Sequence, residues 1–188
     1  MKNRTGGRNV KKRIFPGLTA VIGGIGTAII GIIMNLILIP RIESNTNGIR
    51  CFDMNLFYKP ETAREFLNLI GEEGRFIYLH RQLLLDFIYP VFYTLLFVSL
   101  ICLLCKSGAG RRVLLTGAVI LAISDYAENI MSIIMLKSGV PSDLFAVTAS
   151  VITSLKTIVM YLLILSIIVL LIRFIITRRK GKVNNADD

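Results

Sequence analysis

Four long, uninterrupted runs of apolar residues dominate the pattern of hydrophobic and polar positions along the chain. They are Leu18 to Ile39, Leu83 to Cys105, Val113 to Leu136, and Leu144 to about Ile172. A helix needs about 20 apolar residues to cross the roughly 30 Å hydrocarbon core of a bilayer, so each run is long enough to span a membrane. The pattern predicts an all-α, polytopic membrane protein: a four-helix transmembrane bundle with helices over 14–40, 83–105, 113–136 and 144–172.

A basic stretch precedes the first apolar run, as it does in a secretory signal peptide. The apolar region is too long for such a peptide, however, and no cleavage site of the small-x-small type follows it. We therefore expect the first run to remain in the mature protein as a transmembrane helix.

Polar segments flank the four runs, and the longest of them, 41–82, lies between the first two. Within it, Thr62 and Glu65 have the spacing of a capping box, and Phe66, Leu67 and Ile70 follow on one apolar face. This predicts a short amphipathic helix over about 61–70 that lies on or near the membrane surface.

Lysine and arginine gather on one side of this topology. The formal charge of +10 divides into +6 for the tail 1–13, +3 for the loop 106–112 and +3 for the tail 173–188, while 41–82 and the turn 137–143 are each neutral. Basic residues mark the cytoplasmic side, so we expect a cell-membrane protein with both termini in the cytoplasm and 41–82 outside.

The composition agrees with a membrane protein: 54% of residues are hydrophobic, 18% are charged and the mean hydropathy is +0.67. Because the positive charge lies in short segments beside apolar helices, we expect it to contact anionic lipids on the cytoplasmic side and not nucleic acid.

A charge of −2 is left inside the predicted helices, where Asp86, Asp125 and Glu128 accompany a single cation, Lys156. An ionisable side chain in a transmembrane helix costs at least ~2.5 kcal/mol on insertion scales. The presence of four such side chains in one small protein therefore needs a common explanation. We expect that one carboxyl is protonated, that a cation or a cationic ligand is bound, or that the groups form an ion-pair network that fixes the helices.

Helical spacing gathers these residues and their polar neighbours on shared faces. On the second helix the polar face carries Asp86, Tyr89 and Tyr93, on the third it carries Asp125, Glu128 and Asn129, and on the fourth it carries Thr153, Lys156 and Thr157. All three faces meet in the outer half of the bundle. Pro90 is expected to kink the second helix there and to free a backbone carbonyl.

The first helix carries a stripe of small residues that ends in an amide. The stripe runs through Gly17, Ala20, Gly24, Ala28 and Gly31 to Asn35. Small residues let helices approach closely, so this stripe is expected to bring Asn35 near the polar faces. The alternative is that it forms a homodimer contact.

Four polar motifs stand in sequence order: Gly71-x-x-Gly74-Arg75-x-x-Tyr78, Asp86-x-x-Tyr89-Pro90-x-x-Tyr93, Asp125-x-x-Glu128-Asn129, and Lys156. Together they resemble an uncharacterised group of bacterial four-helix integral membrane proteins. The resemblance covers about residues 60–165 and implies the same four-helix topology. It implies no activity.

Three functions fit these residues. The first is a membrane enzyme or a lipid- or small-molecule-binding protein whose pocket opens to the outer leaflet. In it, Asp125 or Glu128 acts as acid or base and Lys156 stabilises negative charge. The expected ligand-binding residues are Asp86, Tyr89, Tyr93, Asn129, Tyr78 and Asn35, with Arg75 holding a phosphate-bearing headgroup.

The second function is a small cation- or proton-coupled transporter that works as a dimer, because one chain offers no continuous polar path across its aliphatic inner half. The third is a structural or accessory protein whose polar cluster only holds the helices together. We expect no metal and no cofactor, since no P-loop, His-Glu-x-x-His, Gly-x-Ser-x-Gly or Cys/His metal spacing occurs in the chain.

Overall fold

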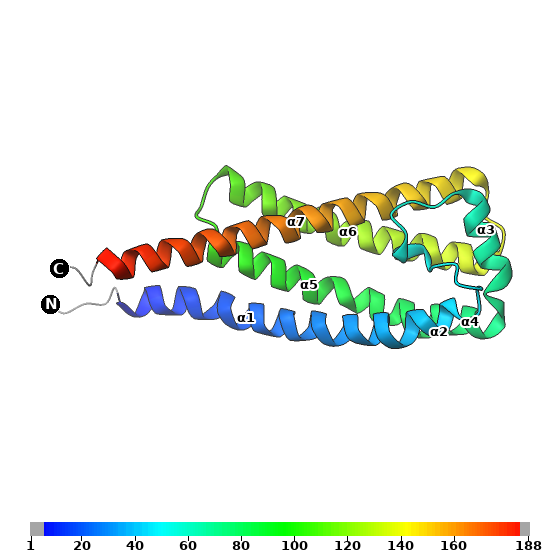
Figure 1. Ribbon diagram of the computed structural model, residues 1–188, viewed down its shortest axis with the longest axis horizontal. Helices are drawn as coiled ribbons and strands as arrows, with labels where there is room; N and C mark the ends of the chain where they lie inside the picture. The colour runs from blue at the N-terminus through cyan, green and yellow to red at the C-terminus, as the bar shows by residue number, and fades with distance from the viewer. Residues whose placement is uncertain (1–5, 185–188) are drawn as a thin grey trace.

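The computed structural model describes residues 6–184, and the surroundings of side chains over 16–178. The predicted basic tails, 1–13 and 173–188, therefore lie partly outside the described residues. Four long helices run side by side and form an elongated bundle (Figure 1). The stretches that are long and apolar enough to cross a membrane are Pro16–Glu43, Gly71–Leu104, Ala109–Ser138 and Asp143–Arg178. The predicted all-α, four-span architecture is confirmed.

The first span consists of helix α1 (Gly6–Ile33), a π-helical turn η1 (Met34–Leu38) and the short helix α2 (Ile39–Glu43). It packs mainly against the second span. The two backbones approach most closely at Gly23, where an added Cβ would lie 2.7 Å from the backbone nitrogen of Leu96, and at Gly26, where it would meet the ring of Phe92.

The predicted small-residue stripe describes this contact only in part. Gly24 and Gly31 do lie beside the second span, whereas Gly17 has no neighbour within 4 Å and Ala28 is exposed. The closest approach runs through Gly23 and Gly26, which the stripe does not include, because the contacting face is rotated slightly around the helix from the predicted line.

The second span runs without a break through helix α4 (Gly71–Ile77), the π-helical turn η3 (Tyr78–Gln82) and helix α5 (Leu83–Leu104). It begins at Gly71, whose φ of +62° ends the preceding helix in the left-handed conformation that glycine adopts easily. The π-helical turns η1 and η3 lie against each other. Such turns widen a helix locally and occur often at functional sites.

The third and fourth spans are helix α6 (Ala109–Ser138) and helix α7 (Asp143–Asn184), which pack against each other. Between them, Gly139 takes a φ of +73° and donates its N–H to the carbonyl of Met135, a usual way to end a helix. The helix α7 also continues into the segment where the sequence suggested a C-terminal tail.

Residues 44–70, which we call the cap, cover the end of the bundle opposite to the two chain ends (Figure 1). The cap contains a short 3₁₀ turn η2 (Phe52–Met54) and helix α3 (Pro60–Leu69). Its core is a cluster of four aromatic rings contributed by Phe52, Tyr58, Phe66 and the neighbouring Tyr78. We call this end of the bundle the capped end and the other the terminal end.

The predicted helix near 61–70 is present as α3, but its expected place on the membrane surface is not confirmed. Its apolar residues Ala63, Phe66 and Leu67 are buried in the protein core. The capping box is also not formed: the helix starts with Pro60 at its first position, after an extended Lys59 that makes no side-chain cap.

The outward surface of the bundle is strongly apolar. Leu36, Ile123 and Leu165, for example, are 71%, 63% and 59% exposed. Side chains of this kind would be unfavourable in water and suit contact with lipid. In the terminal half, the interior is filled by buried apolar side chains, among them Phe97, Ile101, Ala118, Leu121, Leu163 and Ile167.

Candidate functional site

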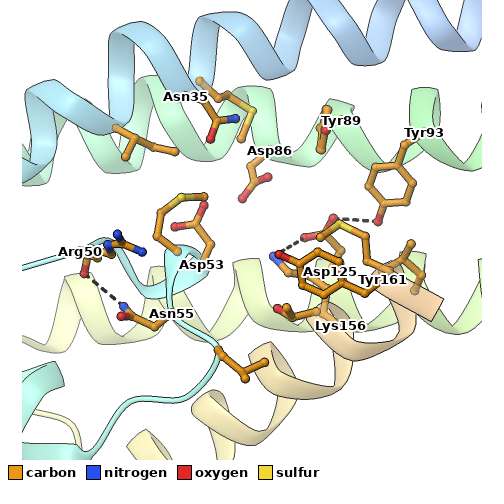
Figure 2. A pocket seen from close by; sticks show the side chains of 17 residues that line it. Asn35, Arg50, Asp53, Asn55, Asp86, Tyr89, Tyr93, Asp125, Lys156 and Tyr161 are labelled. Atoms are coloured by element: carbon orange, nitrogen blue, oxygen red, sulfur yellow. Dashed lines mark hydrogen bonds and ion pairs between the residues drawn. The ribbon is translucent and has the colours of Figure 1, made fainter. Parts of the chain in front are cut away.

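A cavity of about 610 Å³ lies inside the bundle next to the cap (Figure 2). All four spans and the cap contribute to its wall. Its polar lining comes from Asn35, Arg50, Asp53, Asn55, Asp86, Tyr89, Tyr93, Asp125, Lys156, Thr157 and Tyr161. The cavity thus brings together Lys156 and five other residues that the sequence indicated as site candidates. They come from three different spans and are Asn35, Asp86, Tyr89, Tyr93 and Asp125.

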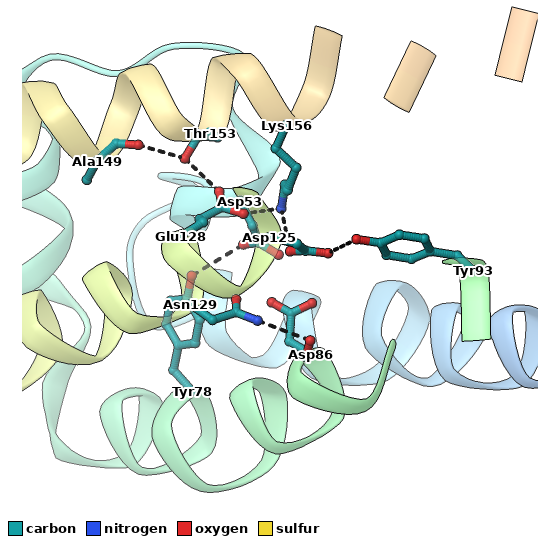
Figure 3. A network of polar contacts seen from close by, with 10 residues as sticks. All are labelled: Asp53, Tyr78, Asp86, Tyr93, Asp125, Glu128, Asn129, Ala149, Thr153 and Lys156. Carbon is teal, nitrogen blue, oxygen red and sulfur yellow. Dashed lines mark hydrogen bonds and ion pairs between the residues drawn. The ribbon is translucent and has the colours of Figure 1, made fainter. Parts of the chain in front are cut away.

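Lys156 is the centre of an ion-pair network at one wall of this cavity (Figure 3). Its ammonium lies 3.3 Å from Oδ1 of Asp125 and also contacts Oε2 of Glu128. The second oxygen of each carboxylate accepts a hydroxyl: Thr153 donates to Glu128 at 2.6 Å and Tyr93 donates to Asp125 at 2.7 Å. Both carboxylates are therefore fully engaged with the protein.

The loss of one helical hydrogen bond explains the position of Asn129. Pro90 has no N–H, so it leaves the carbonyl of residue 86 without its donor four residues on. The side-chain amide of Asn129 donates to that carbonyl at a distance of 3.0 Å. The expectation that Pro90 frees a backbone carbonyl is confirmed, and Asn129 serves the backbone of α5 and does not line the cavity.

The carboxylate of Asp86 differs from the other two. Its residue is only 5% exposed, and its side chain points into the cavity (Figure 2). Within the described part of the chain, it makes no hydrogen bond or ion pair. A buried charge without a partner is strongly unfavourable, so the carboxyl of Asp86 needs a proton, a hydrogen-bond donor or a cation.

A second carboxylate, that of Asp53, enters the cavity from the cap. It lies on residues 50–58, which we call the cavity loop. Its Oδ1 accepts a hydrogen bond of 3.3 Å from the hydroxyl of Tyr78. Burial raises the pKa of Asp53 above its ordinary value, and nearby Asp125 adds to this, while Lys156 opposes it.

The cavity loop is fixed to α7 by two hydrogen bonds. The backbone N–H of Tyr58 donates to the hydroxyl oxygen of Ser150 at 2.8 Å, and the hydroxyl of Ser154 donates to the carbonyl of Leu56 at 2.5 Å. Polar side chains on the turns of α7 nearest the capped end thus hold Asp53 over the cavity. In the sequence, Asp53 is one of six acidic residues in a neutral segment. Only its apolar neighbours Phe52 and Met54 indicate that it is buried.

The rim of the cavity lies between the first and fourth spans. Asn35 on the first span and Arg50 on the cavity loop are exposed, and Tyr161 on α7 is 63% exposed. The first span packs against α5, and α7 packs against α6. The cavity rim therefore lies on the side between α1 and α7.

Besides Asn129, the predicted ligand-binding residues Arg75 and Tyr78 do not line the cavity. The guanidinium of Arg75 donates to the carbonyls of Leu136 and Leu67, so it ties α4 to the end of α6 and to α3. Tyr78 is buried and acts through its hydrogen bond to Asp53. Glu128, predicted as a catalytic residue, also does not line the cavity and contacts its wall through Lys156.

The cavity wall thus combines excess negative charge with aromatic rings. Asp53, Asp86 and Asp125 line it, whereas its cations are Lys156, which is already shared with Glu128, and the exposed Arg50. Among the residues described, no group of three or more His, Cys, Asp or Glu side chains is placed to hold a metal ion. The rings of Tyr89 and Tyr93 meet edge to face beside the acids, with centroids 5.3 Å apart. Carboxylates and aromatic rings together suit an organic cation.

No protein-family model, curated protein or solved structure matches this chain. The resemblance of its polar motifs to a group of bacterial four-helix membrane proteins therefore stays a prediction, and the geometry of the cavity is the basis for its function.

Proposed function

We propose that this protein binds a membrane-resident amphiphile that carries an ammonium group, and that the ammonium enters the cavity and pairs with Asp86. The main support for this proposal is the carboxylate of Asp86, which is buried, has no partner among the described residues and points into a cavity of about 610 Å³. Ligand pockets in proteins commonly measure about 300–1,000 Å³, so the space fits a small molecule or a lipid headgroup.

The charge of the cavity supports a cationic ligand. An ammonium between Asp86 and Asp53 would offset the acidic excess that Lys156 leaves. The ring of Tyr89 would add a favourable cation–π contact. An anionic ligand would add to the acidic excess, and a neutral ligand would at most donate a hydrogen bond to Asp86 without offsetting its charge.

The position of the rim supports an amphiphile rather than a water-soluble amine. The cavity rim includes Asn35 and Tyr161, on two spans whose other exposed side chains are largely apolar. A ligand that enters between α1 and α7 comes from the bilayer and keeps its alkyl chain there. With the basic segments of the terminal end on the cytoplasmic side, the cavity belongs to the outer leaflet.

Catalysis and transport receive less support. Asp125, Glu128 and Lys156, the predicted catalytic residues, are engaged with one another and with hydroxyl groups, which favours a structural role for this network. Transport needs a path to the terminal end, and there the described interior is packed with apolar side chains.

Binding is tested with three dodecyl compounds that differ only in their polar group: dodecylamine, dodecanol and dodecyl phosphate. The protein is placed in phosphatidylcholine nanodiscs at pH 7, and dissociation constants are measured by titration calorimetry against empty nanodiscs. Dodecylamine, protonated at this pH, is expected to bind at least tenfold more tightly than dodecanol, and dodecyl phosphate is expected to bind most weakly.

The substitution Asp86→Asn removes the charge and keeps the size of the side chain. It should weaken dodecylamine binding at least about thirtyfold, which corresponds to ~2 kcal/mol for a buried charge pair. Glu72→Gln is the matched control, because Glu72 is exposed on α4 at the same end of the bundle. Equal binding of dodecylamine and dodecanol, or unchanged binding by the Asp86→Asn protein, would refute the proposal.

A further inference from the structure

A second pocket, of about 430 Å³, lies at the terminal end of the bundle, far from the cavity that contains Asp86. It is formed by the end of α5, the residues just after it, and the fourth span. Its lining consists of Leu104, Cys105, Lys106, Leu170, Arg173, Phe174 and Thr177.

The pocket exists because two neighbouring helices differ in length. Helix α5 ends at Leu104, and Cys105 is already extended, while α7 continues to Asn184. The side of α7 beyond Leu104 is therefore not covered by α5. In Figure 1, α7 extends well past the turn that joins α5 to α6.

The lining has an apolar part and a cationic part. Leu104, Leu170 and Phe174 form the apolar part, and Lys106 and Arg173 supply positive charge. Among the residues that the structure describes, no acidic side chain lines this pocket. The hydroxyl of Thr177 already donates to the carbonyl of Arg173, so binding of a polar ligand is left to the two cations.

A third cation lies next to the pocket. The guanidinium of Arg178 stacks over the ring of Phe174, 4.7 Å from its centroid. This contact holds the ring in place and adds positive charge beside it. The cationic part of the pocket also lies beside Leu104, where the second candidate span ends, which is the depth expected for lipid headgroups.

We propose that this pocket binds an anionic phospholipid. Lys106 and Arg173 would contact the phosphate group, and an acyl chain would lie along Leu170 and the exposed apolar side of α7. The apolar part is the reason to favour a lipid over free phosphate, which would gain nothing from Leu104, Leu170 and Phe174. This site is independent of the ammonium site at the capped end, since none of the described residues lines both.

The test measures lipid binding by native mass spectrometry of the full chain released from a neutral detergent. The probes are dioleoyl phosphatidylglycerol, dioleoyl phosphatidylcholine and inorganic phosphate. Phosphatidylglycerol is expected to bind at least tenfold more tightly than phosphatidylcholine, and phosphate alone is expected not to bind at millimolar concentration. Equal binding of the two lipids, or tight binding of phosphate alone, would overturn the proposal.

Two substitutions locate the site. Lys106→Gln and Arg173→Gln should each weaken phosphatidylglycerol binding roughly fivefold, as expected for one basic residue at an anionic lipid surface. Arg112→Gln is the control, because Arg112 is an exposed cation at the same end that does not line this pocket. If Arg112→Gln weakens binding as much as the other two, the attraction is diffuse and the pocket is not the site.

Thermal unfolding in phosphatidylcholine nanodiscs shows that the variants are folded. All three are expected to unfold within a few degrees of the parent chain, because each removes only a charge near the end of the spans. A lipid-binding loss in a variant with unchanged unfolding supports the pocket. Retained binding in the Lys106→Gln, Arg173→Gln double variant refutes it.

Discussion

Buried carboxylates in this protein have two different environments. Glu128 and Asp125 are held by Lys156 and by hydroxyl groups, whereas Asp86, one helix away, points into a cavity and has no partner among the described residues. The first environment fits a structural network and the second fits a binding site. The two differ in what a substitution does to stability.

Replacing Lys156 with Met should destabilise the protein strongly, because it leaves Asp125 and Glu128 buried without their cation. The expected loss in the free energy of unfolding is about 3 kcal/mol, as for other broken buried ion pairs. Asp86→Asn should lose no stability or gain some, since it removes an unpartnered charge. Unfolding in mixed micelles with increasing denaturing detergent measures both.

The difference in the free energy of unfolding between these two variants distinguishes a carboxylate in a structural network from one that is free to bind a ligand. A loss for Asp86→Asn as large as that for Lys156→Met would mean that Asp86 belongs to the same network and is not free for a ligand. The control is Glu72→Gln, in which an exposed carboxylate on α4 is removed.

The hydrogen bond from Asn129 to the carbonyl of Asp86 should depend on Pro90. Replacing Asn129 with Leu leaves that buried carbonyl without a donor and should cost about 1–2 kcal/mol of stability. In a Pro90→Ala background, the N–H of the new residue can donate to the same carbonyl, so the cost of the Asn129 substitution should fall.

A double-mutant cycle of detergent-induced unfolding measures this coupling. Equal costs of Asn129→Leu in the two backgrounds would show that the amide does not replace the helical hydrogen bond.

Single residues were predictable from the sequence where a local rule fixes them. Helical spacing gathered Asp86, Asp125 and Lys156, and the missing N–H of Pro90 indicated a free carbonyl. Asp53 could not be found in this way, since its apolar neighbours Phe52 and Met54 indicate burial but not that this part of the segment 41–82 folds back over the bundle. Tertiary packing of the cap decides that, through contacts such as those of Ser150 and Ser154.

At the scale of the elements, the close contact between α1 and α5 rests on two glycines. An added Cβ at Gly23 would lie 2.7 Å from a backbone nitrogen of α5, which cannot turn aside as a side chain can. Gly23→Ala should therefore destabilise the protein by about 1–3 kcal/mol. Gly17→Ala is the matched control: its Cβ would meet nothing within 4 Å, and alanine favours a helix.

The same unfolding assay in mixed micelles compares the two alanine variants. Because Gly23 and Gly17 lie on one helix, differences in helix propensity cancel. If both substitutions changed stability equally, the α1–α5 contact would not depend on Gly23.

The helices themselves could largely be predicted from the sequence, because spans of about 20 apolar residues have few alternatives to a transmembrane helix. The contacts that these helices make could not be predicted. The face of α1 that meets α5 differs from the predicted stripe, and the apolar side of α3 is buried in the cap. Both depend on which neighbour a helix finds, and hydrophobic spacing alone does not determine that.

At the scale of the whole molecule, the bundle has a polar cavity near one end and a cationic pocket at the other, with a tightly packed apolar interior between them. This division parallels the charge of the sequence, which is acidic inside the bundle and basic at the terminal end. A cationic ligand at the capped end and an anionic lipid at the terminal end each complement the charge they meet.

The most direct test is a structure of the protein in phosphatidylcholine nanodiscs with dodecylamine, determined by cryo-electron microscopy with a rigid binding protein attached to increase its size. We expect density for the ammonium within hydrogen-bond distance, about 2.7–3.2 Å, of the Asp86 carboxylate, with the alkyl chain leaving between α1 and α7. An empty cavity at saturating dodecylamine, or an ammonium placed away from Asp86, would contradict it.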